Sequence, residues 1–489
     1  MTVQRVLSTA MIPLVAWLLG PTDYGIYNIA LSICALCAVA GGLSLEGSIA
    51  IAQSKEQALA RTLGTSLLAI VSGLVLFGLF CATRSHLLTY YSSHVVSALV
   101  WMIPFLVPLM IISIAMQNYV AYLGEFRYIA LADIGSTVSN YGALFLVYFW
   151  IYSDHRSLII ASFIAFATRL GIFLKAATAN RAVACALWKA DVIQEIWKGR
   201  TFIRFNFPCN ILNTGNVQLP PALLSMRYPE SIVGLFVMAR NIITMPAMFS
   251  GQALGQVFYP KAAKEYREGR GLKQITWQTF VYSCQLTIFP TLFIASAAEF
   301  VLPILLGPKW NGVSLYILLL LPMVLLNAIQ TQIGVGFIFN ILNQLPKIVL
   351  GNALLFLFRI GPLVLCLFIL STRASVTLLA YSIGSAIGYM FLLGWIFKTT
   401  SIPLPRAFWA WTKHLGLAGI CLSPMLLASV GDGPALLLTA LSLSAFLYVC
   451  VAWFFFLTEE QRASLVRRAN RSFCFVKRTI SMTLKSIFP

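Results

Sequence analysis

The stretch IVGLFVMARNIITMPAMFSGQALGQVFYPKAAKEYREG, residues 232–269, combines the two features that decide the fold of this chain. Its first part is apolar for longer than the ~20 residues that a helix needs to cross a bilayer. Its last part is crowded with charged side chains, which are costly inside a membrane. The stretch therefore predicts a membrane span over 231–258 that leads into a solvated loop over 259–274.

The same alternation of apolar stretches and short polar loops runs through the whole chain. Of its 489 residues, 59% are hydrophobic and only 10% are charged, a composition that is rare among soluble proteins. The span-length rule predicts about fourteen transmembrane helices. We place them at 5–20, 26–45, 63–81, 95–117, 132–152, 157–178, 203–226, 231–258, 275–298, 313–340, 348–370, 374–397, 414–430 and 434–457.

Lysine and arginine are almost confined to one side of this predicted bundle. The outer loops carry only Arg84, Arg156, Arg227, Lys309 and Arg373, whereas most of the 34 basic residues fall in the inner loops and in the tail after residue 457. Because cytoplasmic loops collect positive charge, both termini are predicted to lie inside. The net charge of +19 is thereby explained by topology and by a basic tail beside anionic lipids, without a nucleic-acid partner.

The first half of the chain contains a weak copy of the 232–269 stretch and its flanks, 209 residues earlier in the sequence. Eleven of the fifty positions 14–63 are identical in 223–272. The pairs that matter most are two glycines, a Lys-Glu dipeptide and an arginine: Gly25 with Gly234, Gly42 with Gly251, Lys55-Glu56 with Lys264-Glu265, and Arg61 with Arg270. Six predicted spans separate the copies, so both have the same orientation, as in transporters with parallel repeats.

The repeat predicts an all-α integral membrane protein with two six-helix lobes and a C-terminal helix pair. The predicted domains are a lobe over 1–180, a cytoplasmic amphipathic linker over 181–202, a second lobe over 203–397, an accessory pair over 398–457 and a basic cytoplasmic tail over 458–489. The first apolar stretch, Val6–Leu19, is short for a span. Either this helix begins at the membrane interface, or the natural chain has several residues before Met1.

Three arginines fall inside predicted spans, at Arg169, Arg240 and Arg359. A cation at the bilayer centre costs about 2.5–3.5 kcal/mol on insertion scales, so such groups usually face a watery cavity, although snorkelling or helix–helix contacts remain alternatives. Acids are scarcer: Glu46 and Asp133 lie near span ends, where they are either interfacial residues or ion-coupling groups. A cavity with fixed cations and few acids attracts an anionic cargo. The guanidinium group of arginine also forms bidentate hydrogen bonds with phosphate oxygens.

The predicted seventh span is polar at its start. Asn206, Asn210 and Asn213 recur on one helical face. Amides at membrane depth either hold helices together or line a hydrophilic cavity that hydrogen-bonds sugar hydroxyls. The sequence alone favours neither alternative.

No enzyme motif accompanies these groups. The sequence contains no P-loop, no GxSxG, and no paired carboxylates or metal ligands in an outer loop. Cys34 and Cys37 have no second pair or histidine to complete a metal site. We therefore expect neither a catalytic residue, a bound metal nor a cofactor.

Several segments resemble the Wzx-type polysaccharide flippases, a branch of the multidrug/oligosaccharidyl-lipid/polysaccharide exporter superfamily. They are LLGPTDYGIYNIALSI (18–33), GGLSLEGSIA (41–50), the 232–269 stretch and GPKWNGVSLYILLLLPM (307–323). The resemblance covers about residues 10–400. It implies a two-lobed bundle in the bacterial inner membrane that flips undecaprenyl-pyrophosphate-linked oligosaccharide, such as an O-antigen repeat unit of lipopolysaccharide, by alternating access.

On this hypothesis the pyrophosphate binds Arg359, Arg240 and Arg169, the sugars meet Asn206, Asn210 and Asn213, and Glu46 or Asp133 couples an ion. Partners would be the lipid-linked substrate, membrane lipids and a polysaccharide assembly complex with a polymerase and a chain-length regulator. Three rivals are a lipid II flippase, a cation-coupled multidrug exporter of the same fold, and a membrane polymerase or ligase. The exporter should carry more acids at membrane depth, and the polymerase needs a large outer loop, which this chain lacks.

Overall fold

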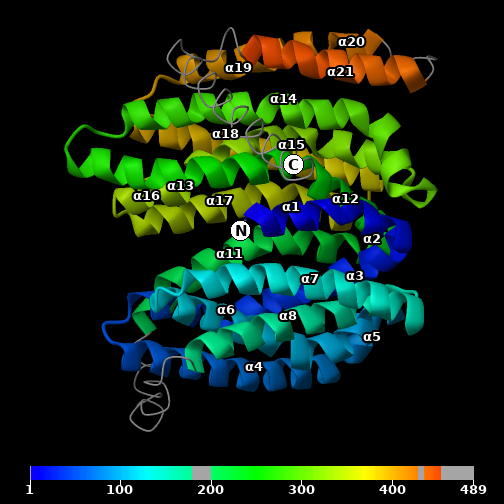
Figure 1. Cartoon of the computed structure of the whole chain (residues 1–489), viewed down its shortest axis with the longest axis vertical. Coiled ribbons are helices and arrows are strands. Elements are labelled where there is room, and N and C mark those ends of the chain that lie inside the picture. Colours follow the sequence, from blue (N-terminus) through cyan, green and yellow to red (C-terminus); the bar gives the residue numbers. More distant parts are fainter. Residues whose placement is uncertain (1, 179–199, 428–433, 453–489) are drawn as a thin grey trace, which may run out of the picture.

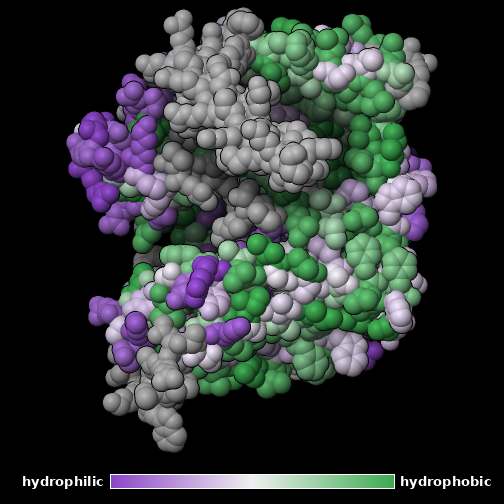
Figure 2. Space-filling view, in the orientation of Figure 1, coloured by the Kyte–Doolittle hydropathy of each residue, from purple (hydrophilic) through white to green (hydrophobic). Residues whose placement is uncertain are grey.

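The computed structural model describes residues 2–178, 200–427 and 434–452, and every regular element in these ranges is a helix. Most of the predicted linker and all of the predicted tail lie outside the described residues. Hydrophobic side chains cover most of the visible surface along the helices, and hydrophilic ones gather at the helix ends, notably where α13 and α14 meet (Figure 2). This distribution is the one a bilayer requires.

Chain order gives the following helices: α1 (Thr2–Ala10), α2 (Ile12–Leu18), α3 (Pro21–Gly42), η1 (Leu45–Ile51), α4 (Lys55–Tyr90), α5 (Ser93–Trp101), η2 (Met102–Leu106), α6 (Val107–Tyr122), α7 (Phe126–Trp150), α8 (His155–Thr178), α11 (Arg200–Leu224), α12 (Glu230–Ile243), α13 (Met245–Arg267), α14 (Lys273–Leu306), η3 (Pro308–Trp310), α15 (Val313–Ile333), α16 (Val335–Ile341), α17 (Leu345–Val364), η4 (Leu365–Ile369), α18 (Ala374–Thr399), α19 (Leu404–Cys421), α20 (Ser423–Leu427) and α21 (Pro434–Val451).

Eight helical stretches among the described residues are long and apolar enough to cross a membrane, or nine if a bent pair counts as one span. The all-helical membrane fold is therefore confirmed, whereas the number fourteen and the orientation of the termini stay predictions. The bent pair is α12 with the start of α13, whose axes differ by 41°. Pro246 lies in the first turn of α13, where proline suits a helix start but cannot donate a backbone hydrogen bond to continue α12.

The helices form two groups along the longest axis of the molecule (Figure 1). Helices α4 to α8 make one group, and α13 to α18 make the other, with α19 to α21 along its far edge. Between them α3 packs against both α11 and α12. The contact between the two groups thus joins the two copies of the sequence repeat.

A close approach of the two backbones lies at the predicted outer end of this contact. A Cβ atom on Gly25 of α3 would lie 1.9 Å from the Glu230 carbonyl oxygen of α12, and one on Gly234 would lie 1.9 Å from the Pro21 oxygen of α3. Gly25 and Gly234 are equivalent positions of the repeat, and so are Pro21 and Glu230. The contact is therefore reciprocal, as a two-fold relation between the copies requires.

Further contacts close the same end around this glycine pair. Trp310 Nε1 donates to the Ala16 carbonyl at 2.9 Å, and Trp17 Nε1 donates to the Leu305 carbonyl at 2.9 Å. Tyr24 meets the edge of the Trp310 ring at 5.6 Å between centroids. Helix α2 and the loop after α14 thus cover the predicted outer side of the α3–α12 contact.

We expect Gly25→Val or Gly234→Val to disrupt this contact, since no side chain fits between the two backbones and overpacking costs about 1–3 kcal/mol or more. In a cysteine-free chain carrying Asn241→Cys, an impermeant maleimide should label residue 241 faster in either valine variant. Gly78→Val is the matched control, because a Cβ there meets nothing within 4 Å. Unchanged labelling in both glycine variants would show that the interface is open already.

Candidate functional site

A cavity of about 730 Å³ lies among α11, α12, α13, α15, α16, α17 and α18. Its volume falls within the range of small-molecule sites. Eight of its lining side chains are amides, and they are Asn210, Asn213, Asn216, Asn241, Asn327, Gln330, Asn340 and Asn352. Arg240 and Arg359 also line it, and no aspartate or glutamate of the described residues does.

Arg359 supplies a buried cation to this cavity. It lies on α17, on one helical face with Asn352 and Leu355, and only 6% of it is exposed. Its guanidinium donates from Nε to the Tyr381 hydroxyl at 2.8 Å and from Nη1 to the Tyr389 hydroxyl at 3.1 Å. These acceptors are neutral, and the described residues offer no carboxylate, so the charge itself is not compensated.

Arg240 brings a second cation from α12. Its Nη1 donates to the Val217 carbonyl at 2.8 Å, and its guanidinium carbon lies 5.6 Å from the centre of the Phe236 ring. As with Arg359, its partners among the described residues include no acid. Since an unpaired charge away from bulk water is costly, two such cations facing one cavity suit an anionic ligand.

Only part of the predicted asparagine face of α11 lines the cavity. Asn210 and Asn213 line it, and Asn210 Nδ2 also donates to the hydroxyl of Ser44, just after α3, at 3.1 Å. Asn206, one turn earlier, is half-buried and is not among the lining residues. One turn later, Asn216 lines the cavity with 2% exposure, and neither its Oδ1 nor its Nδ2 has a partner within the described structure.

Several polar residues that line the cavity were not predicted from the sequence. Asn327, Gln330 and Thr331 share one face of α15, and Asn352 precedes Arg359 by two turns on α17. Their helical spacing could have been read from the sequence. Asn340 and Asn241 could not, because only the packing of α16 and α12 brings them to the same space.

Arg169 does not line this cavity. It lies on α8 and donates from Nη2 to Asp133 Oδ1 of α7 at 3.1 Å and to Gln117 Oε1 of α6 at 2.6 Å. Asp133 is buried, with 5% of its side chain exposed, and Arg169 retains 22%. The predicted phosphate ligand and the predicted ion-coupling acid are thus partners in one ion pair inside the first group of helices.

Glu46 lies in η1, the short helix between α3 and α4. It is half-buried, and burial raises the pKa of its carboxyl above the ordinary glutamate value. Asn118 Nδ2 of α6 donates to the backbone oxygen of Glu46 at 2.9 Å, which leaves the carboxyl itself outside that bond. Among the described residues, no cluster of three His, Cys, Asp or Glu side chains could hold a metal ion.

This architecture is the fold of lipid flippases and multidrug transporters. The structure titled lipid II flippase MurJ, inward closed conformation, superposes with a TM-score of 0.69 at 13% identity, covering 93% of this chain and 99% of that one. An inward-facing multidrug resistance transporter of the MATE family, in the MOP superfamily, gives 0.59 at 12% identity, over 81% and 94% of the two chains. At these identities the likeness shows the shared fold alone.

The chain belongs to the family described as polysaccharide biosynthesis protein, whose model matches residues 14–315. This match confirms the polysaccharide family that the sequence resemblance predicted. No curated protein matches the chain.

The different surroundings of the arginines predict different effects on stability. Arg169→Met should lower the thermal unfolding midpoint in detergent strongly, because removing one partner of a buried ion pair costs about 3–5 kcal/mol. Arg359→Met should lower it far less, since the substitution removes an uncompensated charge and keeps most of the volume. An equal loss in both variants would contradict the view that the charge of Arg359 is a net cost to stability.

Proposed function

We propose that this protein is a flippase that moves undecaprenyl-pyrophosphate-linked oligosaccharide across the bacterial inner membrane by alternating access. One observation carries the proposal: Arg240 and Arg359, without acid partners among the described residues, line a cavity whose other polar groups are mostly amides. Family membership supports a role in polysaccharide biosynthesis, and the fold supports transport rather than catalysis.

The cavity suits the two polar parts of such a substrate. A pyrophosphate carries several anionic oxygens, which guanidinium groups bind with short, charge-assisted hydrogen bonds. Sugar hydroxyls both donate and accept, and amides do the same. Asn216 is already buried, with both amide atoms unpartnered in the described structure, so a sugar there would satisfy groups that otherwise cost free energy. The polyprenyl chain would remain in the membrane.

Transport requires the cavity to open to each side in turn. The predicted lobes, 1–180 and 203–397, would rock against each other, and the reciprocal Gly25–Gly234 contact would separate when the outer side opens. The predicted basic tail would remain at the cytoplasmic side, where a polysaccharide polymerase and a chain-length regulator could associate with the protein.

Two rivals share the fold. A cation-coupled drug exporter should present carboxylates to its cargo, and the described cavity lining contains none. A lipid II flippase would use the same pyrophosphate chemistry, and it is the second candidate because its headgroup also combines phosphate with sugars. Only a test with each substrate separates it from the leading proposal.

The first test is translocation of a fluorescent undecaprenyl-pyrophosphate oligosaccharide in proteoliposomes. Losing a hydrogen bond to a charged group costs about 1.5–3 kcal/mol, so Arg240→Gln and Arg359→Gln should each slow flipping about tenfold or more. Arg127→Gln is the matched control, because 73% of that side chain is exposed and it should leave the rate unchanged. Efflux of a cationic dye without lipid flipping would overturn the proposal, and faster flipping of lipid II would favour the second candidate.

The same vesicles test ion coupling. We infer that Glu46 takes up the coupling proton, because its raised pKa lets it hold a proton at pH values where a solvated glutamate has lost it. Glu46→Gln should therefore abolish the response of the flipping rate to an imposed pH gradient while leaving the protein folded. Asp133→Asn should instead lower thermal stability, because it removes the carboxylate that balances the charge of Arg169. A full pH response in the Glu46 variant would exclude Glu46 as the coupling group.

A further inference from the structure

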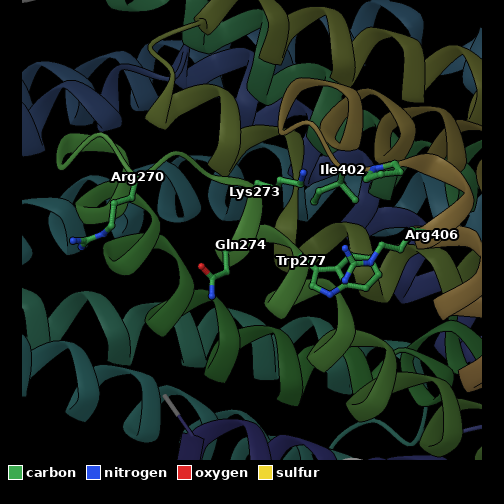
Figure 3. A pocket seen from close by; sticks show the side chains of 7 residues that line it. Arg270, Lys273, Gln274, Trp277, Ile402 and Arg406 are labelled. Atoms are coloured by element: carbon green, nitrogen blue, oxygen red, sulfur yellow. The ribbon is translucent and has the colours of Figure 1, made fainter.

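A second cavity, separate from the amide-lined one, lies where α14 and α19 begin. Its volume is about 390 Å³. Loops on the predicted cytoplasmic side lead into both helices. Three of its lining residues are cations, Arg270, Lys273 and Arg406, and no acid of the described residues lines it. We call it the basic pocket (Figure 3).

Two of the three cations are available to a ligand. Arg270 points away from the others in Figure 3 and pairs with Glu265 at 2.6 Å and with Glu268. Lys273 has no ion pair with a described residue. Arg406 lies over the Trp277 ring, 4.6 Å from its centre, which orients the guanidinium without neutralising it.

The backbone adds to this positive character. Helix α14 starts at Lys273 and α19 starts at Leu404, and neither preceding residue, Leu272 or Pro403, caps its helix with a side-chain hydrogen bond. The first backbone N–H groups of a helix lack intrahelical acceptors, and its N-terminus carries a partial positive charge. These two helix ends, beside Lys273 and Arg406, make the basic pocket electropositive, although Pro405 leaves the first turn of α19 one N–H group short.

An apolar groove lies next to the basic pocket. It has a volume of about 240 Å³ and lies among α14, α15, α18 and α19. Trp277 of the pocket touches Phe280 of the groove, with 5.7 Å between ring centroids, and Arg406 and Ala407 are consecutive. Groove residues Met390 and Phe408 are 56% and 62% exposed, so the groove faces lipid.

We propose that the basic pocket and this groove together bind an anionic phospholipid of the inner leaflet, as a resident lipid and not as cargo. The headgroup phosphate lies between Lys273 and Arg406, and one acyl chain follows the groove. Charge complementarity at one end and apolar lining at the other select an anionic amphiphile over a soluble anion or a neutral lipid. None of the residues that line the translocation cavity lines the groove or the pocket.

Such a lipid would join two parts of the protein. Helices α14 and α19 pack on each other, and α19 belongs to the predicted accessory pair. A phosphate held between the two helix starts and a chain between their flanks would hold α19 in place while the lobes move.

The test uses the full chain, purified in a neutral detergent, with phosphatidylglycerol as the probe. The thermal unfolding midpoint should rise with phosphatidylglycerol, but not with phosphatidylcholine or inorganic phosphate. The double variant Lys273→Gln/Arg406→Gln should bind phosphatidylglycerol about tenfold more weakly, a difference of about 1.4 kcal/mol. Lys261→Gln removes one charge from the exposed end of α13 and should bind as the unmodified chain does.

A second variant tests the groove separately. A Cβ at Gly394 would meet only Leu404 Cδ2, at 3.8 Å, so Gly394→Leu should fill the groove and weaken lipid binding without unfolding the protein.

Three other outcomes would overturn the proposal. Equal stabilisation by inorganic phosphate would mean that the pocket binds any anion and not a lipid. Equal stabilisation by phosphatidylcholine would mean that the cations do not select the lipid. Displacement of phosphatidylglycerol by undecaprenyl phosphate at equal concentration would assign the groove to the cargo. None of these readouts requires flipping, so failure of the proposed function leaves this proposal standing.

Discussion

The close approach of two backbones, at Gly25 and Gly234, is the constraint on which the arrangement of the helices depends. Nothing larger than hydrogen fits at either position, so the backbones of α3 and α12 approach this closely only because both residues are glycine. Because the two positions are equivalent in the sequence repeat, each copy supplies one of the two glycines that the contact requires. The surrounding Trp17 and Trp310 hydrogen bonds fix α2 and the loop after α14 onto the same contact.

Arginine has two different roles in this bundle, and the partners distinguish them. Arg169 is neutralised by Asp133 and shared with Gln117, which makes it a structural link among α6, α7 and α8. Arg359 is more deeply buried yet has only hydroxyl and thioether partners within the described residues. A protein that keeps a charge in such a place forgoes stability there, and an anionic ligand that shares the cavity would offset the cost.

The sequence predicted the helical membrane fold and several residues that line the cavity, because these depend on patterns that act along one helix, whereas the family was predicted from the resemblance of several segments. Arg359, Arg240, Asn210 and Asn213 were found from such helical patterns. The pairing of Arg169 with Asp133 was not, since the two lie 36 positions apart and meet only through the packing of α7 on α8.

Helix ends show the same limit of local patterns. Hydropathy placed the start of the thirteenth span at 414, because Arg406 and Lys413 interrupt the apolar run. The helix begins at Leu404 instead, since a proline in the first turn favours helix initiation whatever the polarity. Predicted span 231–258 likewise became two helices at Pro246. In both cases a proline in the first turn sets where the helix begins, and a hydropathy average over about twenty positions does not detect it.

Helix α12 connects the constraint at the outer end with the chemistry of the cavity. Gly234 and Arg240 lie on the same helix, six residues or roughly 9 Å apart at 1.5 Å per residue, with no break between them. Asn241, next to Arg240, lines the cavity and also donates to the Tyr24 hydroxyl of α3 at 3.0 Å. A ligand that pulls on Arg240 or competes for Asn241 therefore acts on the helix that closes the outer side. The position of Arg240 thus matters as much as its charge, because a cation elsewhere in the cavity wall would bind the same anion without reaching the α3–α12 contact.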